Sequence, residues 1–341
     1  MRGLLLTQPG EYAVRELAEP VPGPGEVLVA PAAVGICGSD LELLTGQRPA
    51  AYVRYPVVPG HEWVGTVISC GPGETPIEAG TAVVAEGVRS CGECQRCAEG
   101  RTNLCTGPYA ETGFTHAGAL AQRVVVPTRQ VHVLPPTRLS ATAVLIEPAA
   151  CVATGLLEVG APLAGARIAV VGDGPLGLLA VALLRLSGPA ELLLLGTHPE
   201  RAGRVRALGA SDVIMRDIPV LEVPRLRGLF DLVVEATNSP EGAATALGLS
   251  RRAGTVILLG ISGAGRPAID PDVITLGHLH VQGVFSASRA AWHWLVDLYA
   301  GGQFDPAELI THTFALDEVA DAFAVLGDRS AGALKVVVEP N

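Results

Sequence analysis

The hydrophobic positions of this chain follow two patterns, one towards its ends and one in its middle. Towards the ends, short apolar or alternating stretches are separated by Pro and Gly, which predicts β-strands joined by turns. Helical spacing of apolar residues predicts helices at 40–44, 289–300 and 317–326. The strands expected towards the ends cover residues 4–6, 27–30, 63–68, 119–126, 131–134 and 334–338.

The middle of the chain, from about residue 167, alternates fully apolar runs with helical patterns. Fully apolar runs are typical of parallel strands that are buried on both faces. Six such strands with helices between them predict a doubly wound nucleotide-binding domain, so the expected fold class is α/β. The six strands are expected at 167–171, 191–195, 212–214, 230–237, 255–260 and 280–285.

A glycine-rich turn joins the first of these strands to the helix that follows it. The sequence Gly-Asp-Gly-Pro-Leu-Gly has the spacing that lets the backbone approach the pyrophosphate of a dinucleotide, which then rests on the helix N-terminus. Thr237 and Gly260, at the ends of the fourth and fifth strands, are also predicted cofactor contacts. The predicted contacts within the turn are Gly172, Gly174, Pro175, Leu176 and Gly177.

The end of the second strand bears on the choice of cofactor. Enzymes that use NAD place an Asp or Glu there to bind the ribose 2′-hydroxyl, whereas this chain has Gly196, which leaves room for a 2′-phosphate. Thr197 can donate a hydrogen bond, and positive charge is available from His198, Arg201 and Arg204. These residues favour NADP(H). The alternative is that Glu200 takes the role of the acid and the cofactor is NAD(H).

A cysteine and a histidine near the start of the chain are candidate ligands of a catalytic metal. Cys37 and His61 offer the sulfur and nitrogen that zinc prefers, and a catalytic zinc keeps one position open for water or substrate. Glu62 is beside His61 and is a second-shell carboxylate or an occasional ligand. Glu147 is a candidate third ligand, because a carboxylate in an apolar stretch is costly unless it is paired. The alternative for Glu147 is an acid at a helix start.

Four cysteines stand close together in a lobe at about residues 90–106. Two residues separate the first from the second and the second from the third, and seven separate the third from the fourth. This density predicts a closed, tetrahedral, structural zinc site on Cys91, Cys94, Cys97 and Cys105. Free thiols, a disulfide pair or an iron–sulfur cluster are the alternatives. The last is disfavoured because that class of spacing usually ends in Cys-Pro.

Composition and charge exclude several classes of protein. The chain has 341 residues, enough for two domains, and its net charge of −10 disfavours nucleic acid as a partner. The most apolar stretch, 168–186, contains Asp173 and Arg185 and is not expected to span a membrane. No signal peptide is expected, and seven clustered cysteines favour metal over disulfides. A cytoplasmic protein is therefore expected.

Together these motifs resemble those of the zinc-dependent medium-chain dehydrogenases/reductases, within them the polyol and sugar dehydrogenase branch. The resemblance rests on residues 35–40, 59–62, the cysteine lobe, Glu147 with its following proline, and the glycine-rich turn. It implies a GroES-like, β-rich catalytic domain at residues 1–148 and 287–341 and a Rossmann domain at 149–286. It also implies a catalytic zinc on Cys37 and His61, with Glu147 as a ligand directly or through water.

Further roles come only from this resemblance. Ser39 matches a hydroxyl that passes the substrate proton towards solvent, and Lys335 matches a basic residue that touches the cofactor pyrophosphate. Two positions depart from the family pattern. Glu42 stands where liver-type alcohol dehydrogenases have a relay histidine, and Ser286 stands where sorbitol dehydrogenases have an arginine that grips the polyol.

The predicted function is hydride transfer between a nicotinamide cofactor, with NADP(H) preferred, and a secondary alcohol or ketone of a polyol, sugar or aminocyclitol. The alternatives are a simple alcohol dehydrogenase, a zinc-free reductase of the same fold, and a non-catalytic nucleotide-binding protein. The set Cys37, Ser39, His61 and Glu147 weighs against the last of these. A homodimer or homotetramer is expected, with strand 281–285 as a candidate edge.

Overall fold

The structure is a computed structural model that describes residues 1–73, 77–215, 224–261 and 269–341. The chain divides into two compact units. Unit 1 consists of Met1–Glu147 and Ala287–Asn341, and unit 2 consists of Pro148–Ser286. The division falls inside one helix, because α3 (Ile146–Leu157) begins in unit 1 and continues in unit 2.

Unit 1 is rich in β-structure. One sheet of seven strands follows the order β14-β15-β3-β4-β5-β7, with β6 also paired to β3, while β1 and β2 form a separate hairpin. Its α-helices are α1 (Gly38–Thr45), α2 (Gln95–Ala98), α8 (Arg289–Ala300) and α9 (Val319–Gly327). Its strands are β1 (Arg2–Gln8), β2 (Glu11–Glu16), β3 (Glu26–Ile36), β4 (Glu62–Cys70), β5 (Ala82–Ala85), β6 (Val124–Pro127), β7 (Val131–Leu134), β14 (Ile310–Ala315) and β15 (Lys335–Glu339).

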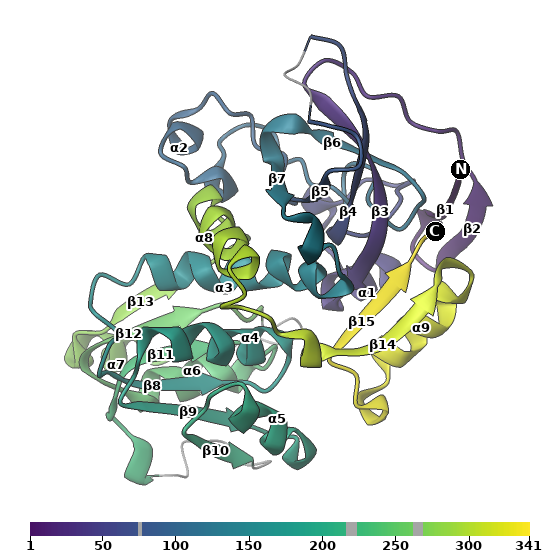
Figure 1. The fold of residues 1–341 in the computed structure, drawn as a ribbon. Helices are drawn as coiled ribbons and strands as arrows, with labels where there is room; N and C mark the ends of the chain where they lie inside the picture. The colour runs from purple at the N-terminus through teal and green to yellow at the C-terminus, as the bar shows by residue number, and fades with distance from the viewer. Residues whose placement is uncertain (74–76, 216–223, 262–268) are drawn as a thin grey trace. The chain divides into compact units, whose positions relative to one another are not determined.

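The long strand β3 is the centre of unit 1. It pairs with β4 on one side and with the last strand, β15, on the other, so segments from the two ends of the sequence share one sheet (Figure 1). Most of its side chains are buried, and the core around it includes Leu4, Trp63, Phe114 and Phe323. This antiparallel pairing brings the end of β3 next to the start of β15 on one side and the start of β4 on the other.

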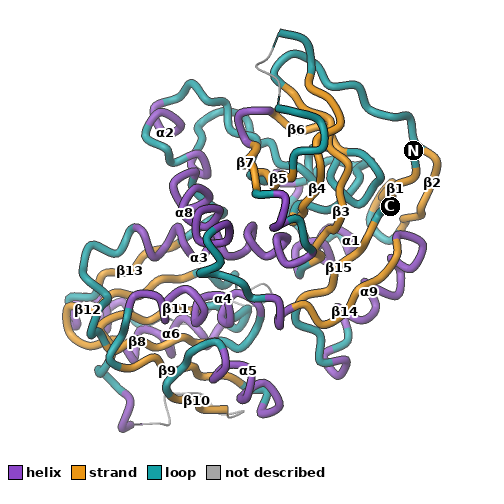
Figure 2. Tube along the Cα trace, in the orientation of Figure 1, coloured by secondary structure: helices purple, strands orange, loops and turns teal. Residues whose placement is uncertain are grey.

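One predicted strand of unit 1 is wrong in extent. Of the predicted stretch 119–126, only residues 124–126 belong to a strand, β6 (Val124–Pro127). The N–H groups of Ala119 and Leu120 donate instead to the carbonyl groups of Gly60 and Pro59, at 2.9 and 3.0 Å. This segment therefore braces the loop that leads to His61. In Figure 2, loops also carry most of the chain from β5 through α2 to β6.

Unit 2 contains the doubly wound domain expected from the sequence. Its six strands are all parallel, in the order β10-β9-β8-β11-β12-β13, and the order reverses between β8 and β11. Ligands of such sheets bind at the carboxyl ends of the strands at this reversal. Besides α3, its α-helices are α4 (Pro175–Leu184), α5 (Ala202–Ala207), α6 (Pro240–Leu249) and α7 (Pro271–Gly277). The strands are β8 (Arg167–Val171), β9 (Glu191–Gly196), β10 (Asp212–Met215), β11 (Phe230–Glu235), β12 (Ser250–Leu258) and β13 (His280–Gly283).

Candidate active site

Three potential metal ligands meet where β3 ends and β4 begins. Cys37 caps the N-terminus of α1 directly after β3, and His61 directly precedes β4. The ligand atoms of Cys37, His61 and Glu62 all lie within 4.8 Å of one another, and Cys37 Sγ is 3.5 Å from His61 Nε2. Bond lengths of about 2.3 Å to sulfur and 2.0–2.1 Å to nitrogen around a tetrahedral zinc require roughly this separation. The donor atoms and their spacing fit zinc.

A buried carboxylate lies behind these ligands. Asp40 is fully buried, and its Oδ2 accepts a 3.0 Å hydrogen bond from the backbone N–H of Cys37. Its Oδ1 is 3.5 Å from Nδ1 of His61. Burial by itself lowers the pKa of His61, but Asp40 and Cys37 outweigh it and raise this pKa well above its usual value. Asp40 thus favours a proton on Nδ1, which leaves Nε2 to bind metal once its own proton is displaced.

Glu62 is also held by a buried ion pair. Its Oε2 is 2.5 Å from Nζ of Lys335, and both side chains are almost completely buried. Lys335, on β15, is the only lysine in the sequence. Gly35 makes room for the pair, because a Cβ there would meet Glu62 Oε2 at 2.4 Å. Burial lowers the pKa of Lys335, but Glu62 and Cys37 outweigh burial and raise it. The predicted contact of Lys335 with the cofactor stays a prediction.

Glu147 lies near the three ligands but is not a member of their cluster. It is the second residue of α3, as expected for an acid at a helix start, and it is partly buried within reach of several charges. Burial raises the pKa of Glu147 to about 7, with Glu62 and Glu111 adding to the rise and His61 opposing it. Its role as a zinc ligand, directly or through water, stays a prediction.

The hydroxyl of Ser39 is close to the proposed metal. Ser39 Oγ lies 2.9 Å from Cys37 Sγ, and the side chain is only partly buried. A hydroxyl in this position is next to a ligand sulfur and also has access to the outside of the unit. This placement suits the predicted transfer of the substrate proton, which stays a prediction.

The four cysteines of the lobe also converge. Their sulfur atoms all lie within 4.8 Å of one another, and none of the four forms a disulfide. Backbone N–H groups of Thr106 and Cys97 lower the pKa of the Cys94 thiol to about 5, whereas burial raises the pKa of Cys97 to about 12. The donor set and its spacing fit a structural zinc.

A buried carboxylate connects the lobe to the sheet of unit 1. Glu86, directly after β5, accepts hydrogen bonds from Thr102 of the lobe at 3.1 Å and from Arg289 of α8 at 2.9 Å. The ring of His132 lies 3.4 Å from the same carboxylate and stacks on Trp292. The lobe is therefore fixed to β5 and α8 by polar contacts.

The glycine-rich turn of unit 2 has the geometry expected of a dinucleotide site. A Cβ on Gly177 would lie 1.9 Å from the carbonyl oxygen of Gly172, so α4 can approach β8 only with glycine there. At Gly174, the N-cap of α4, a Cβ would have open space around it. A pyrophosphate can therefore approach the first N–H groups of α4, whose donors have no partner within the helix. The turn fits a dinucleotide.

The ends of β11 and β12 are joined by one carboxylate. Glu235 accepts hydrogen bonds from the N–H of Thr237 at 2.7 Å and the N–H of Gly260 at 3.2 Å. A Cβ on Gly260 would lie 1.7 Å from the carbonyl oxygen of Thr237. Both predicted cofactor residues are thus held side by side at the carboxyl end of the sheet, and the sequence analysis missed Glu235, which connects them.

Asp173, the variable residue of the glycine-rich turn, corrects one step of the cofactor argument. The space beside Gly196 was expected to be open, but a Cβ there would lie 2.6 Å from the carboxyl group of Asp173. This carboxylate accepts the N–H groups of Thr197 and His198 at 3.0 and 2.8 Å. Nη1 of Arg201 donates to the backbone carbonyl of Asp173 at 2.9 Å. A negative charge therefore occupies the end of β9 after all, supplied from a neighbouring loop.

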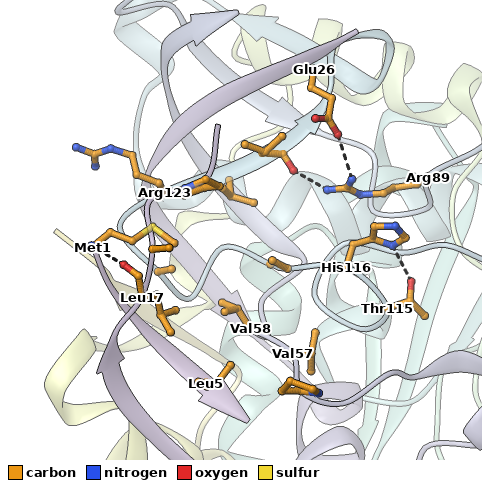
Figure 3. Close-up of a pocket in the computed structure, with 18 residues that line it drawn as sticks. Met1, Leu5, Leu17, Glu26, Val57, Val58, Arg89, Thr115, His116 and Arg123 are labelled. Carbon is orange, nitrogen blue, oxygen red and sulfur yellow. Dashed lines mark hydrogen bonds and ion pairs between the residues drawn. The ribbon is translucent and has the colours of Figure 1, made fainter. Parts of the chain in front are cut away.

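A separate cavity of about 440 Å³ lies within unit 1 (Figure 3). Apolar side chains such as Val57 and Val58 line it together with Arg89, Glu26 and His116. Its wall includes the stretch before His61, and the N–H of Gly118 donates to the carbonyl of Val58 at 2.7 Å. Arg89 is already engaged by Glu26 and by the carbonyl of Val125.

The match with known protein families agrees with this two-unit arrangement. Residues 23–136 match the alcohol dehydrogenase GroES-like domain, and residues 140–339 match the glucose dehydrogenase C-terminus. These matches and the geometry define a two-domain dehydrogenase with a metal site in its first domain. No helix in the described parts of the chain is both long enough and apolar enough to cross a membrane.

Individual relatives match over nearly the full length. The starvation-sensing protein RspB of Escherichia coli K12 is 30% identical, with 99% of each chain covered. An L-threonine 3-dehydrogenase of Streptomyces avermitilis is also 30% identical, over 97% of this chain and 96% of the relative. The structure of a protein named as a zinc-binding dehydrogenase, from Sinorhizobium meliloti 1021 and bound to NADP, has a TM-score of 0.90 at 31% identity, with 99% of each chain covered. This chain belongs to the zinc-dependent medium-chain dehydrogenases/reductases and is an oxidoreductase.

Proposed function

We propose that this protein is a zinc-dependent dehydrogenase that transfers a hydride between a nicotinamide cofactor and a secondary alcohol or ketone of a polyol, sugar or aminocyclitol. The observation that carries the proposal is the convergence of Cys37 and His61, 3.5 Å apart, with the buried Asp40 behind the imidazole. Relatives that act on polyhydroxylated substrates support it, since a sorbitol dehydrogenase of Bacillus subtilis is 28% identical over 98% of its length.

The residues of unit 1 have distinct roles in the proposed reaction. Cys37 and His61 would hold a zinc ion, with Glu147 as a third ligand directly or through water, and Asp40 orients the imidazole. When bound, zinc supplies a Lewis acid for the substrate oxygen, and the nicotinamide supplies the acceptor or donor of the hydride. On oxidation Ser39 Oγ accepts the hydroxyl proton of the substrate while it passes its own proton on towards solvent, and on reduction both transfers reverse.

For the cofactor, the sequence argument favours NADP(H) over NAD(H). It rests on Thr197 as a hydrogen-bond donor and on the positive charge available from His198, Arg201 and Arg204, all of which follow β9. The carboxylate of Asp173 opposes a 2′-phosphate at the same place. We therefore expect binding of both cofactors with a small preference for NADP(H).

We also propose that the protein forms a homodimer or homotetramer through β13. This strand is at the edge of the parallel sheet, and Val281 on it is 37% exposed. An exposed edge strand is a template for pairing with a second chain. We also propose a cytoplasmic location, since the clustering of the cysteines favours metal binding over disulfides.

The test combines metal analysis with turnover. Purified protein should contain about two zinc ions per chain, one on each ligand cluster. Initial rates should be measured with polyols, sugars, aminocyclitols and simple alcohols, each with NADP⁺ and NAD⁺. One zinc per chain with no turnover would leave only a structural site, and activity in zinc-free protein would favour a zinc-free reductase. Activity confined to simple alcohols would refute the proposed substrate class.

A further inference from the structure

A small space beside the metal site is bordered by two carboxylates. Gly87 is buried and has no side chain. Among the described residues other than its two chain neighbours, a Cβ there would have only Glu111 Oε1, at 3.7 Å, and Glu147 Oε1, at 3.9 Å, within 4 Å. Both oxygens therefore face the same space. Glu147 is a candidate for the metal site, but the proposed reaction gives Glu111 no role.

Glu111 is fixed in this orientation by contacts on its other oxygen. Nη2 of Arg48 donates to Oε2 at 2.8 Å, and the hydroxyl of Tyr109 donates to the same oxygen. The side chains of Glu111 and Arg48 are 9% and 12% exposed. The N–H of Thr112 also donates to the carbonyl of Gly87 at 3.0 Å, which holds the two loops together. Arg48 compensates the buried charge, while Oε1 stays directed towards Gly87.

Contacts between side chains connect Arg48, which holds Glu111, to a candidate metal ligand. The guanidinium of Arg48 lies 3.6 Å above the ring of Phe114, and this ring in turn contacts the ring of His61, with centroids 4.8 Å apart. Glu111 Oε1 also lies beside Glu147, a candidate metal ligand.

The carboxylate oxygens beside Gly87 favour a substrate group that donates hydrogen bonds. Carboxylate oxygens accept hydrogen bonds and repel anions, so a phosphate or carboxylate group is disfavoured there. A neutral hydroxyl can donate one hydrogen bond, whereas an ammonium group donates up to three, and its hydrogen bond to a carboxylate is charge-assisted. The nearby ring of Phe114 is apolar and suits the carbon skeleton of a ring or chain.

We propose that Glu111 is a substrate-specificity residue that accepts a hydrogen bond from an ammonium group of an amino-substituted polyol or cyclitol, close to the carbon that is oxidised. The inference rests on the proposed function and narrows its substrate class. Arg48 and Tyr109 act as positioning residues, because they hold Glu111 without facing Gly87.

The test measures binding of two matched probes, scyllo-inosamine and scyllo-inositol, to the zinc-loaded full chain with NADPH bound, by isothermal titration calorimetry at pH 7. The wild-type protein should bind the amine about tenfold more tightly than the inositol, as expected for a charge-assisted hydrogen bond. Glu111→Gln should remove this difference by weakening amine binding alone. Glu308→Gln, at an exposed site of unit 1, is the matched control and should bind as wild type does.

The zinc content of each variant and a second variant distinguish a folding defect from the loss of the proposed hydrogen bond. Glu111→Asp retains the charge but withdraws the carboxylate from the space beside Gly87, so it should also weaken amine binding. The inference is wrong if Glu111→Gln weakens both probes equally, if the amine preference survives, or if neither probe binds the wild-type protein. Turnover of a hydroxyl-only alcohol by zinc-loaded protein in those cases would leave the proposed function standing, whereas absence of zinc and of turnover would refute that as well.

Discussion

Replacing Lys335 with methionine should destabilise unit 1 strongly, because Glu62 would lose its buried partner. The two side chains are 1% and 2% exposed, and their charged atoms are 2.5 Å apart. Methionine has a similar length but no charge, so Glu62 would stay buried with an unpaired carboxylate. Removing one partner of a buried ion pair costs about 3–5 kcal/mol in free energy of unfolding. The rest of the contact surface of β15 would be unchanged.

The assay can be confined to the affected unit. All three tryptophans of the chain, at positions 63, 292 and 294, belong to unit 1, so tryptophan fluorescence during urea unfolding reports on that unit. The pKa of Lys335 is raised in the folded protein, so its contribution is fully present below the unfolded value of 10.5 and is lost only as pH rises through the folded value. Measurements at pH 8 with zinc bound are therefore appropriate.

A matched double variant tests the reasoning. Glu62→Gln combined with Lys335→Met removes both charges and should recover most of the loss, because no charge is left buried alone. Arg2→Met, which breaks the exposed ion pair with Asp317, should leave the unfolding midpoint nearly unchanged. A loss below about 1 kcal/mol for Lys335→Met, typical of an exposed ion pair, would refute the buried-pair argument.

Three further predictions concern the metal and cofactor sites. In metal-free protein at pH 7, Cys94 should be the first cysteine of the lobe to react with iodoacetamide and Cys97 the last, because the pKa values of their thiols are about 5 and about 12. Bound zinc should protect both thiols. Peptide mass spectrometry measures the extent of alkylation at each cysteine. Cys37→Ser should abolish turnover and halve the zinc content while calorimetry shows unchanged cofactor binding; surviving turnover would contradict the metal assignment. Asp173→Asn should raise the affinity for NADP⁺ relative to NAD⁺ by about tenfold in the same calorimetric assay, since a like charge is removed; an unchanged ratio would dismiss this role.

Much of the fold could be predicted because runs of apolar residues indicate which segments are buried. The apolar run of β8 predicts a strand buried on both faces, and the structure confirms it, as it confirms the order of strands typical of this domain. Strand β14 was not predicted, because its sequence Ile-Thr-His-Thr-Phe-Ala lies at the edge of its sheet and is only partly buried. The expected strand at 119–126 was too long, since hydrogen bonds to the loop before His61 replace part of it.

Only those residues of the candidate site that belong to short sequence motifs could be predicted. Cys37 and His61 could be found because their residue types and flanking glycines are informative on their own. The pairing of Glu62 with Lys335 joins residues 273 positions apart, and that of Arg48 with Glu111 joins residues 63 apart. No local pattern encodes such distant contacts. Asp173 was overlooked because it occupies the variable position of a motif defined by its glycines.

The burial of the only lysine has a consequence for the chemistry of the surface. Apart from an α-amino group, the folded chain exposes no primary amine, and its outward-facing cations are guanidinium groups, which stay charged at all physiological pH values. Acylating reagents, aldehydes and enzymes that modify lysine therefore find no ε-amino target on the native protein. Such a reagent becomes a sensor instead. Because Lys335 is buried, its modification by such a reagent would measure how often the pairing between β3 and β15 opens.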